Sequence, residues 1–346
     1  MEAAMKASVF AQHGGPEVLQ YTEVPEPKLG HGDVLVRVRA CALNHLDLWV
    51  RKGLPGVQIP LPHIPGSDNA GEVARIGEGV TRARVGEKVV LAPGLSCNVC
   101  DACLAGLDNT CRRYTILGYM VDGGCAEYVR VPEVNVLPMP ERLSFEEAAA
   151  VPLVFLTAWH MLMTRAGLRP GESVLVLGAG SGVGSAAIQI ARLAGAQVFA
   201  TAGSDAKLAK AKELGADQLI NHSKHDIAEE VKRLTSKRGV DIVFEHVGSA
   251  TWEKSLASLA PRGRLVTCGA TTGFEAKINI RQLFVHQWSL LGSYMGTRAE
   301  LRTVLGLVEQ GKLQPVVDRE FPLAEAASAH AHLEKREQFG KVVLKV

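Results

Sequence analysis

The sequence has no surplus of charge of either sign. Its 38 lysines and arginines nearly balance its 36 aspartates and glutamates, which leaves a formal net charge of +2 at pH 7. No block of basic residues stands out, although proteins that bind nucleic acids usually carry one. The composition therefore gives no reason to expect a nucleic-acid partner.

Long apolar runs are also absent. The longest, residues 148–163, is interrupted by Pro152, Thr157 and His160 and is too short to span a bilayer. Residues 1–6 lead directly into strand-like sequence, without the apolar core of a signal peptide. We expect no membrane-spanning segment and a cytoplasmic protein.

Repeats, low-complexity linkers and the composition of a disordered chain are missing as well. Hydrophobic residues make up 47% of the chain and charged residues 21%, which is ordinary for a globular protein. At 346 residues, the chain is long enough for two domains.

The chain has seven cysteines, an odd number, and four of them fall within fifteen residues. Their spacing, Cys97-x2-Cys100-x2-Cys103-x7-Cys111, predicts a four-thiolate shell for one structural Zn²⁺ rather than a disulfide framework. An iron–sulfur cluster is a competing interpretation, but it favours a fourth cysteine three residues on and followed by proline. Metal-free thiols are another alternative. The other cysteines, expected to be small buried hydrophobic residues, are Cys41, Cys125 and Cys268.

A glycine-rich loop follows the apolar run Val174–Leu177. It reads Gly178-Ala179-Gly180-Ser181-Gly182-Val183-Gly184 and continues into an Ala- and Ile-rich helical segment, residues 185–192. The spacing departs from the strict G-x-G-x-x-G pattern, but a turn free of side chains at a helix N-terminus suits a pyrophosphate. We predict that the loop binds a dinucleotide; the alternative is a strand-to-helix turn without a ligand.

Six short apolar runs, with helical segments between most of them, predict a doubly wound parallel sheet with the glycine loop after its first strand. The runs are Val174–Leu177, Gln197–Thr201, Leu219–Ile220, Asp241–Glu245, Arg264–Thr267 and Ser289–Leu291. Residues 1 to about 140 differ, because short runs set off by glycine and proline predict a β-rich domain. These runs are Val34–Ala40, Glu72–Ile76 and Lys88–Leu91.

This order of segments resembles the medium-chain dehydrogenase/reductase superfamily over essentially the full length. Besides the cysteines and the glycine loop, Gly66-Ser-Asp-Asn-Ala-Gly71 looks like that family's G-H-E-x-x-G segment, and Phe339-Gly-Lys-Val-Val-Leu344 like its closing strand. The resemblance implies an α/β protein with two domains. A GroES-like catalytic domain would comprise residues 1–156 and 295–346, with a zinc lobe at 95–113, and a Rossmann domain with a six-stranded parallel sheet would comprise residues 157–294.

The resemblance also reveals what is missing. Zinc alcohol dehydrogenases hold a catalytic metal with a cysteine, a histidine and a second cysteine, and the aligned residues here are Asn44, Ser67 and Phe155. The glutamate after the second ligand is Asp68, and the usual proton-relay residues are absent. An alcohol must lose a proton before its hydride can leave, so these losses disfavour alcohol oxidation by the zinc mechanism. What remains resembles the zinc-free quinone oxidoreductases and enoyl reductases, whose conjugated acceptors supply their own electron sink.

The resemblance implies roles for several residues near the reacting atoms: Asn44 as a substrate or nicotinamide contact, Thr157 as a contact to the nicotinamide ribose, Asp47 as an orienting residue and His45 as a contact to the pyrophosphate. Capping a helix or forming an ion pair is an equal alternative for Asp47. The proton donor stays open among His63, Tyr119 and solvent.

The second strand ends at Ala202, where NAD-dependent relatives carry an aspartate. After Gly203, Ser204 and Lys207 can offer a hydroxyl and a cation to a 2′-phosphate, which favours NADP(H) over NAD(H). Asp205 is an alternative ribose ligand for NAD, or a cap of the next helix. Further coenzyme contacts implied by the resemblance alone are His222 at the adenosine end, Cys268-Gly269-Ala270 and Gly292-Ser293 near the nicotinamide, and Lys341 at the pyrophosphate.

The sequence therefore predicts an NAD(P)H-dependent oxidoreductase that transfers hydride to an activated alkene or a quinone without a catalytic metal. It would act on a small-molecule substrate and carry one structural Zn²⁺ per chain. One alternative is an alcohol dehydrogenase with a non-standard metal site made by Asp68, His63 or His45; another is a nucleotide-binding protein without turnover. The apolar sixth strand, near residues 289–295, would lie at a sheet edge and predicts a homodimer or homotetramer.

Overall fold

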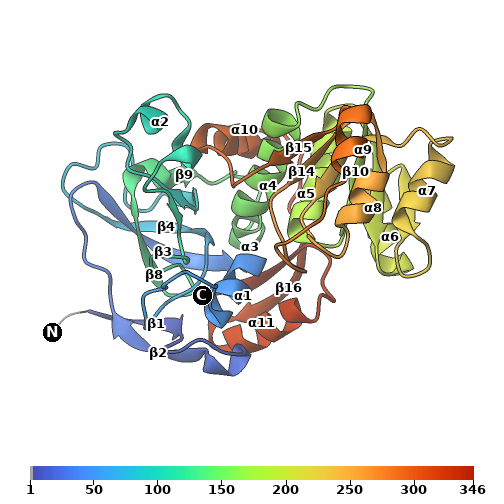
Figure 1. The fold of residues 1–346 in the computed structure, drawn as a ribbon. Helices are drawn as coiled ribbons and strands as arrows, with labels where there is room; N and C mark the ends of the chain where they lie inside the picture. Colours follow the sequence, from blue (N-terminus) through green and yellow to red (C-terminus); the bar gives the residue numbers. More distant parts are fainter. Residues whose placement is uncertain (1–2) are drawn as a thin grey trace. The chain divides into compact units, whose positions relative to one another are not determined.

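The computed structural model of the protein describes residues 3–346, and the chain divides into two units (Figure 1). Of the described residues, unit 1 contains those up to 153 and residues 297–346, and unit 2 contains residues 154–296. The domain boundaries expected from the sequence, after residues 156 and 294, fall close to these divisions. Each unit has a sheet and an apolar core of its own.

The main sheet of unit 1 has the strand order β16-β17-β3-β4-β5-β9, and β8 also pairs with β3. Its strands are β1 (Ala4–Val9), β2 (Gln20–Pro25), β3 (Asp33–Ala42), β4 (Asp68–Ile76), β5 (Lys88–Leu91), β6 (Gly94–Leu95), β7 (Thr115–Ile116), β8 (Tyr128–Pro132), β9 (Val136–Pro138), β16 (Val317–Pro322) and β17 (Lys341–Lys345). Its helices are α1 (His45–Lys52), α2 (Asp101–Leu104), α3 (Phe145–Ala149), α10 (Arg298–Glu309) and α11 (Ala326–Glu334). The β-rich character predicted for the first part of the chain is confirmed.

The alternation of apolar and basic residues explains β3, the strand with most partners in this sheet. Val34, Val36 and Val38 belong to the core of unit 1, whereas Arg39 pairs with Glu72 of β4 at 2.8 Å. The last strand, β17, pairs antiparallel with β3, and the backbone bond from Leu43 to Val342 extends this pairing. The C-terminal strand therefore lies beside the segment that leads from β3 into α1.

Unit 2 is a parallel sheet with the strand order β12-β11-β10-β13-β14-β15. The strands are β10 (Ser173–Val176), β11 (Gln197–Ala202), β12 (Gln218–Asn221), β13 (Val240–Glu245), β14 (Leu259–Thr267) and β15 (Ser289–Gly292). The helices are α4 (Pro152–Trp159), which begins at the end of unit 1, a π-helical segment (His160–Arg165), α5 (Gly182–Leu193), α6 (Asp205–Glu213), α7 (Ile227–Leu234), α8 (Trp252–Ala257) and α9 (Ile280–Val285).

All six predicted strands of unit 2 are present, and the doubly wound α/β fold is confirmed. All four residues of β10 are buried, which is typical of a parallel strand and explains why such strands appear as continuous apolar runs. Only β14 differs much from its expectation, because it begins at Leu259 rather than Arg264. Among residues 3–346, no helix has the length and apolar character that crossing a membrane requires.

Candidate active site

Three side chains that lie far apart in the sequence form a buried hydrogen-bonded ring in unit 1. The Lys341 ammonium donates to Asn44 Oδ1 at 2.5 Å and to Asp68 Oδ2 at 2.9 Å. Asn44 Nδ2 donates to the same Asp68 oxygen at 2.8 Å, which closes the ring. The other Asp68 oxygen accepts the backbone N–H of Leu153 at 2.8 Å. The exposed fractions of Asn44, Asp68 and Lys341 are 6%, 0% and 3%, so the ion pair is shielded from water.

The ring fixes the orientation of the Asn44 amide. A lysine ammonium has only donors and an ionised carboxylate has only acceptors. The amide oxygen must therefore face Lys341 and the amide nitrogen must face Asp68, because the reverse would pair donor with donor and acceptor with acceptor.

Asp47 lies next to the ring and caps α1. Its fully buried carboxylate accepts the backbone N–H of Asn44 at 2.7 Å and that of Gly66 at 3.0 Å. Burial raises the pKa of Asp47 to about 6, against the lowering effect of these bonds and of Lys341. Asp47 therefore has the helix-capping role that was one of the alternatives expected from the sequence. Its bond to the backbone N–H of Asn44 also holds that residue in place.

Lys341 makes contacts that the sequence did not suggest. The resemblance predicts a pyrophosphate contact, but the ammonium lies in the ring with Asn44 and Asp68. The physical reason is the pairing of β17 with β3, which carries Lys341 to the start of α1. Sequence reasoning recognised both family segments, around Gly66 and around Phe339, but had no signal that they meet.

The histidines considered as proton donors or phosphate contacts have structural partners. His63 is buried, with Nε2 3.1 Å from Gly118 O and Nδ1 3.6 Å from the Asp122 carboxylate. Burial lowers the pKa of His63, which favours the neutral ring. His45 packs edge-on against Trp49, with ring centroids 5.0 Å apart.

The glycine loop joins β10 to α5 in unit 2. Gly178 has a φ of 58° and makes the turn, and the Ser181 side chain caps α5 by accepting the Gly184 N–H at 2.9 Å. Position 184 has to be glycine, because a Cβ there would lie 2.4 Å from Gly178 O. The helix N-terminus is thereby held close to the strand end, with backbone N–H groups available for a phosphate. The remaining loop residues are Ala179, Gly180, Gly182 and Val183.

A histidine that sequence reasoning missed lies at the switch point of this sheet. The strand order reverses between β10 and β13, where dinucleotides bind in doubly wound folds. His246 follows β13, and its Nε2 lies 2.8 Å from Leu177 O and 3.5 Å from Ser181 Oγ. Burial lowers the pKa of His246, so a neutral ring donates to Leu177 and braces the loop. Nothing in the sequence around position 246 distinguished a histidine at a binding site from one that only packs in the fold.

Three basic side chains gather beyond the carboxyl end of β11. Burial, and after it the charges of Lys254 and Lys207, lower the pKa of His222. The Lys254 ammonium itself pairs with the Asp226 carboxylate at 3.1 Å. Gly203 lies against the same ring, since a Cβ there would be 3.2 Å from His222 Nε2. Ser204 caps α6 by accepting the Lys207 N–H at 3.4 Å. Sequence reasoning missed Lys254, which α8 supplies.

Asp205, the alternative ribose ligand, is engaged elsewhere. Its carboxylate accepts from Asn221 Nδ2 and from Lys224 Nζ, each at 2.6 Å. These hydrogen bonds, with that of Lys224 the stronger, lower the pKa of Asp205. Ala202, at the end of β11, is buried and offers no carboxylate.

The four cysteines of the lobe meet in unit 1. Their sulfurs all lie within 4.8 Å of one another, and the separations Cys97–Cys103, Cys100–Cys103 and Cys100–Cys111 are 3.9, 3.6 and 3.8 Å. Metal–sulfur bonds of ~2.3 Å in a tetrahedron place the sulfurs about 3.8 Å apart, so this donor set fits Zn²⁺. The backbone N–H of Val99 lowers the pKa of the Cys97 thiol to about 5, which favours the thiolate that a metal needs.

The cysteine lobe is attached to the N-terminus of α10. The Arg298 guanidinium donates to Asn98 Oδ1 at 2.6 Å, and the Arg298 backbone N–H donates to Asp108 Oδ1 at 3.2 Å. Asn98 lies between the first two cysteines and has a φ of 62°. The order of the lobe and that of the first turn of α10 are therefore linked.

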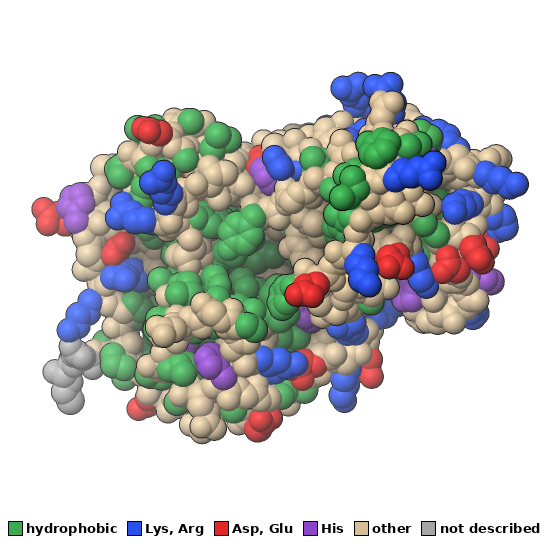
Figure 2. All heavy atoms as spheres, viewed as in Figure 1, with side chains coloured by type: hydrophobic (Ala, Val, Ile, Leu, Met, Phe, Trp, Pro, Cys, Tyr) green, Lys and Arg blue, Asp and Glu red, His purple; other side chains and the backbone are tan. Residues whose placement is uncertain are grey.

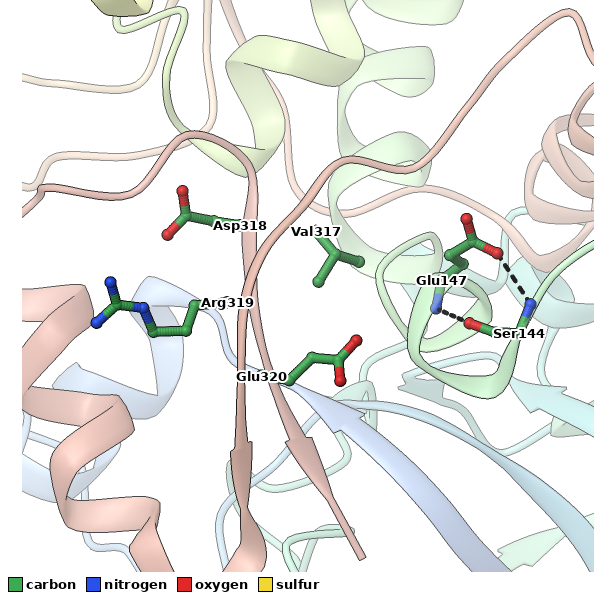
Figure 3. Close-up of a pocket in the computed structure, with 6 residues that line it drawn as sticks. All are labelled: Ser144, Glu147, Val317, Asp318, Arg319 and Glu320. Atoms are coloured by element: carbon green, nitrogen blue, oxygen red, sulfur yellow. Dashed lines mark hydrogen bonds between the residues drawn. The ribbon is translucent and has the colours of Figure 1, made fainter.

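A polar hollow of about 610 Å³ opens beside β16 (Figure 3). It is lined by Ser144, Glu147, Val317, Asp318, Arg319 and Glu320. Its polar groups serve the fold: Ser144 and Glu147 form the capping box of α3, and Asp318 accepts the Phe339 N–H at 3.0 Å. Because it contains none of the predicted site residues, we do not assign the reaction to it.

Comparisons with known proteins cover the whole chain. The family model described as an alcohol dehydrogenase GroES-like domain matches residues 30–141, and that of a zinc-binding dehydrogenase matches residues 182–310. An alcohol dehydrogenase from Geobacillus stearothermophilus is 37% identical, with 99% of this chain and 100% of that protein covered. A quinone oxidoreductase from Pseudomonas aeruginosa is 35% identical, with 97% and 98% covered. A solved structure, a crystal structure of an NAD-dependent alcohol dehydrogenase, is 50% identical and superimposes with a TM-score of 0.96. The match covers 99% of this chain and 100% of that one.

The chain belongs to the medium-chain dehydrogenase/reductase superfamily. It is therefore an enzyme, an oxidoreductase that uses a nicotinamide coenzyme, and the prediction of a GroES-like domain beside a Rossmann domain is confirmed. The four-cysteine lobe supports a zinc ion in this medium-chain dehydrogenase/reductase.

Unpaired buried hydroxyls of unit 2 fit such a coenzyme. Thr157 Oγ1 and Ser293 Oγ, both expected to contact the nicotinamide half, are buried without a hydrogen-bond partner among residues 3–346. Buried hydroxyls are nearly always paired, so these two are suited to accept a ligand. Cys268-Gly269-Ala270 follow β14, and Gly292 ends β15. Burial raises the pKa of the Cys268 thiol to about 12, so the side chain is a neutral thiol.

Proposed function

We propose that the protein transfers hydride from NADPH to an activated alkene or a quinone without a catalytic metal. The observation that carries the proposal is the buried ring of Asn44, Asp68 and Lys341. Asn44 occupies the position of the first metal ligand of zinc alcohol dehydrogenases, and a side-chain ammonium already lies against its oxygen. Neutral amide, hydroxyl and phenyl groups at the three ligand positions make a poor shell for Zn²⁺, which prefers thiolate and imidazole.

A conjugated acceptor suits these residues. When bound, the reduced coenzyme supplies a hydride. As the β-carbon of an enone gains that hydride, an electron pair moves to the carbonyl oxygen, and no alcohol has to lose a proton. The protein has to orient the acceptor and to stabilise the charge on that oxygen, a task for the fixed amide of Asn44. Thr157 supplies a hydroxyl for the nicotinamide ribose, and solvent supplies the proton that completes the reduction.

An alcohol dehydrogenase with a non-standard metal site is the second candidate. It is favoured by the 50% identical solved relative, which is named an NAD-dependent alcohol dehydrogenase. Such a site would have to use Asp68 with His63 or His45. Asp68 already accepts three hydrogen bonds, and among residues 3–346 the four cysteines form the only close group of three or more metal-ligating side chains. We therefore favour the metal-independent reductase.

Metal analysis and a substrate panel separate the two candidates. We expect one zinc ion per chain, NADPH oxidation with para-benzoquinone or cyclohexenone, and no reduction of NAD or NADP by ethanol or benzyl alcohol. Two tightly bound metal ions per chain together with alcohol turnover would contradict the proposal.

The preference for NADP(H) rests on the basic cluster of Lys207, His222 and Lys254. A 2′-phosphate placed among them would lie near two cations, of which Lys254 also pairs with Asp226 at 3.1 Å. The Asp205 carboxylate accepts from Lys224 and Asn221, which disfavours it as the ligand of a ribose diol. Removing one charged hydrogen-bond partner should weaken NADPH binding about tenfold and leave NADH binding unchanged. Lys207→Ala and Lys254→Ala test this by fluorescence titration, with Lys212→Ala near the far end of α6 as the control. Equal losses for both coenzymes would count against the 2′-phosphate assignment.

We also propose a homodimer built on β15. This strand lies at the edge of the parallel sheet and is only partly buried. Exposed apolar side chains gather over α9 and its flanks (Figure 2), at Phe274, Ile278, Ile280, Phe284, Val285 and Tyr294. An edge strand and an exposed apolar surface in the same unit favour pairing with a second copy of the chain.

A further inference from the structure

We infer that Lys341 is a positioning residue that fixes and polarises the Asn44 amide, so that the second Asn44 N–H becomes the donor for the acceptor oxygen. This inference rests on the proposed function and names the group that carries it out. The observation is the closed ring in which one ammonium, one amide and one carboxylate bind one another.

The Asn44 amide has one N–H group left over. The amide nitrogen donates to Asp68 at 2.8 Å, and it also makes a long hydrogen bond to Ala42 O at 3.5 Å, the outer limit for such a bond. The ammonium 2.5 Å from Oδ1 draws electron density toward the oxygen, which makes the remaining N–H a stronger donor. Of the three residues of the ring, Asn44 has the largest exposed fraction, 6%, against 3% for Lys341 and 0% for Asp68, which favours Asn44 as the residue that meets the substrate.

The backbone of Asn44 is held as firmly as its side chain. Asp47 accepts the Asn44 N–H at 2.7 Å, and Asn44 is the N-cap of α1. A donor fixed on both sides needs no reorganisation when charge develops on the acceptor oxygen, which is where preorganised donors lower a barrier most. Lys341 thus supplies, through Asn44, positive potential of the kind that other members of the superfamily obtain from a metal.

The small stabilising effect of a buried ion pair favours a functional role for the ring over a purely structural one. A buried ion pair seldom stabilises a fold more than an apolar pair of similar size. The protein nevertheless keeps Lys341 and Asp68 buried, with an amide bridging them at the first metal-ligand position. The arrangement fits a functional role for the ammonium.

Four variants test the inference. Lys341→Met removes the charge and keeps the length, and it should lower kcat at saturating NADPH by about a hundredfold, as removal of an oxyanion donor does, with less than threefold change in the KM for NADPH. Lys341→Arg, which keeps a cation, should recover at least a tenth of the lost rate. Lys345→Met is the matched control on the same strand, because Lys345 pairs with Glu146 and Glu320 at the surface, and its kcat should stay within twofold of wild type.

The double variant Lys341→Met/Asp68→Asn separates catalysis from folding. It removes both charges together, so its melting temperature should return toward that of the wild type, while its kcat should stay low. Recovery of kcat along with the melting temperature would overturn the inference, as would a Lys341→Met enzyme with wild-type kcat.

The wild-type substrate panel reports on the proposed function separately. If the wild type reduces aldehydes and leaves enones and quinones unchanged, the proposed substrate class is wrong. The same variants are then compared in aldehyde reduction, where the acceptor oxygen also gains charge, and the same losses are expected.

Discussion

Three of the buried charged side chains of unit 1 contact Asn44: Asp47, Asp68 and Lys341. Asp68 and Lys341 form an ion pair at 2.9 Å, which leaves Asp47 without a cation of its own. Two backbone N–H groups stabilise its carboxylate, but burial outweighs them and raises the pKa of Asp47 to about 6. The protein therefore holds a proton on Asp47 at a pH where an exposed aspartate is ionised.

This shift predicts a pH-dependent contribution of Asp47 to stability. A folded-state pKa of about 6 lies above the ordinary value of 3.8, so the folded protein binds this proton more tightly than the unfolded chain. The contribution is complete below the ordinary value and is lost as the pH rises through about 6. We expect the unfolding free energy of the wild type relative to Asp47→Asn to fall by roughly 2 kcal/mol between about pH 4 and about pH 7.

Urea denaturation of both proteins across this range measures the difference. His330, whose pKa burial and Arg51 lower to about 3, also titrates on unfolding, but it is present in both proteins and cancels. A difference that does not change with pH would contradict the assignment of the shifted proton to Asp47.

Among the elements, the glycine loop depends on one close approach. Gly184 lies in the first turn of α5, and a Cβ added there would be 2.4 Å from Gly178 O. Gly306, in the middle of α10, has nothing within 4 Å of the same position. Two identical substitutions in helices should therefore have opposite effects.

We expect Gly184→Ala to displace the loop and to weaken NADPH binding at least tenfold. Gly306→Ala should leave binding unchanged and raise the unfolding free energy by ~0.5–1 kcal/mol, because alanine loses less backbone entropy in a helix. Coenzyme titration and chemical denaturation of the pair provide the measurements. Normal coenzyme affinity in Gly184→Ala would show that the loop does not need this contact to bind phosphate.

The cysteine lobe has little apolar packing to hold it. Its strands β6 and β7 are two residues long, α2 has four residues, and Val99, Leu104 and Leu107 are exposed. Such a segment depends on its metal for order. Arg298 links it to α10 through Asn98 and Asp108, so the effect of metal loss should reach that helix.

We therefore expect chelation of zinc to speed amide exchange in residues 97–111 and in the first turn of α10, while β10 to β14 keep their protection. Hydrogen–deuterium exchange with mass spectrometry, before and after treatment with a chelator, measures this. Arg298→Ala should loosen the first turn of α10 with zinc still bound, as metal content will show. Unchanged exchange in the lobe after complete zinc removal would mean that packing alone orders it.

At the scale of the whole molecule, what could be predicted depended on the distance in sequence between interacting parts. The strands of unit 2 were predictable because a buried parallel strand is a local apolar run, and the zinc lobe because its ligands lie within one short segment. The ring of Asn44, Asp68 and Lys341 was not, because it joins residues 297 positions apart through a strand pairing that no local pattern encodes.

The same limit applied to the coenzyme site. Ser204 and Lys207 follow directly from the end of β11, whereas Lys254 approaches His222 from α8. His246 looked like any residue after an apolar run until the reversal of strand order placed it beside the glycine loop. Tertiary packing, and not composition, brings these side chains near the proposed coenzyme site.

Assembly is the property of the whole molecule that the surface of unit 2 predicts. Ile280 and Phe284 are 73% and 66% exposed on α9, and β15 offers its unpaired edge nearby in the chain. In a twofold dimer both features would be covered, so the wild type should sediment with twice the 37.0 kDa mass of the chain.

Ile280→Asp/Phe284→Asp should shift the protein to the monomer mass, because a buried unpaired carboxylate costs several kcal/mol. Val85→Asp, at a residue 62% exposed in unit 1, is the matched control and should stay dimeric. Circular dichroism of all three proteins should be the same, so that a lighter species reflects dissociation and not unfolding. A wild type that sediments as a monomer at micromolar concentration would leave the apolar surface of α9 without this explanation, and a double variant that stays dimeric would place the interface elsewhere.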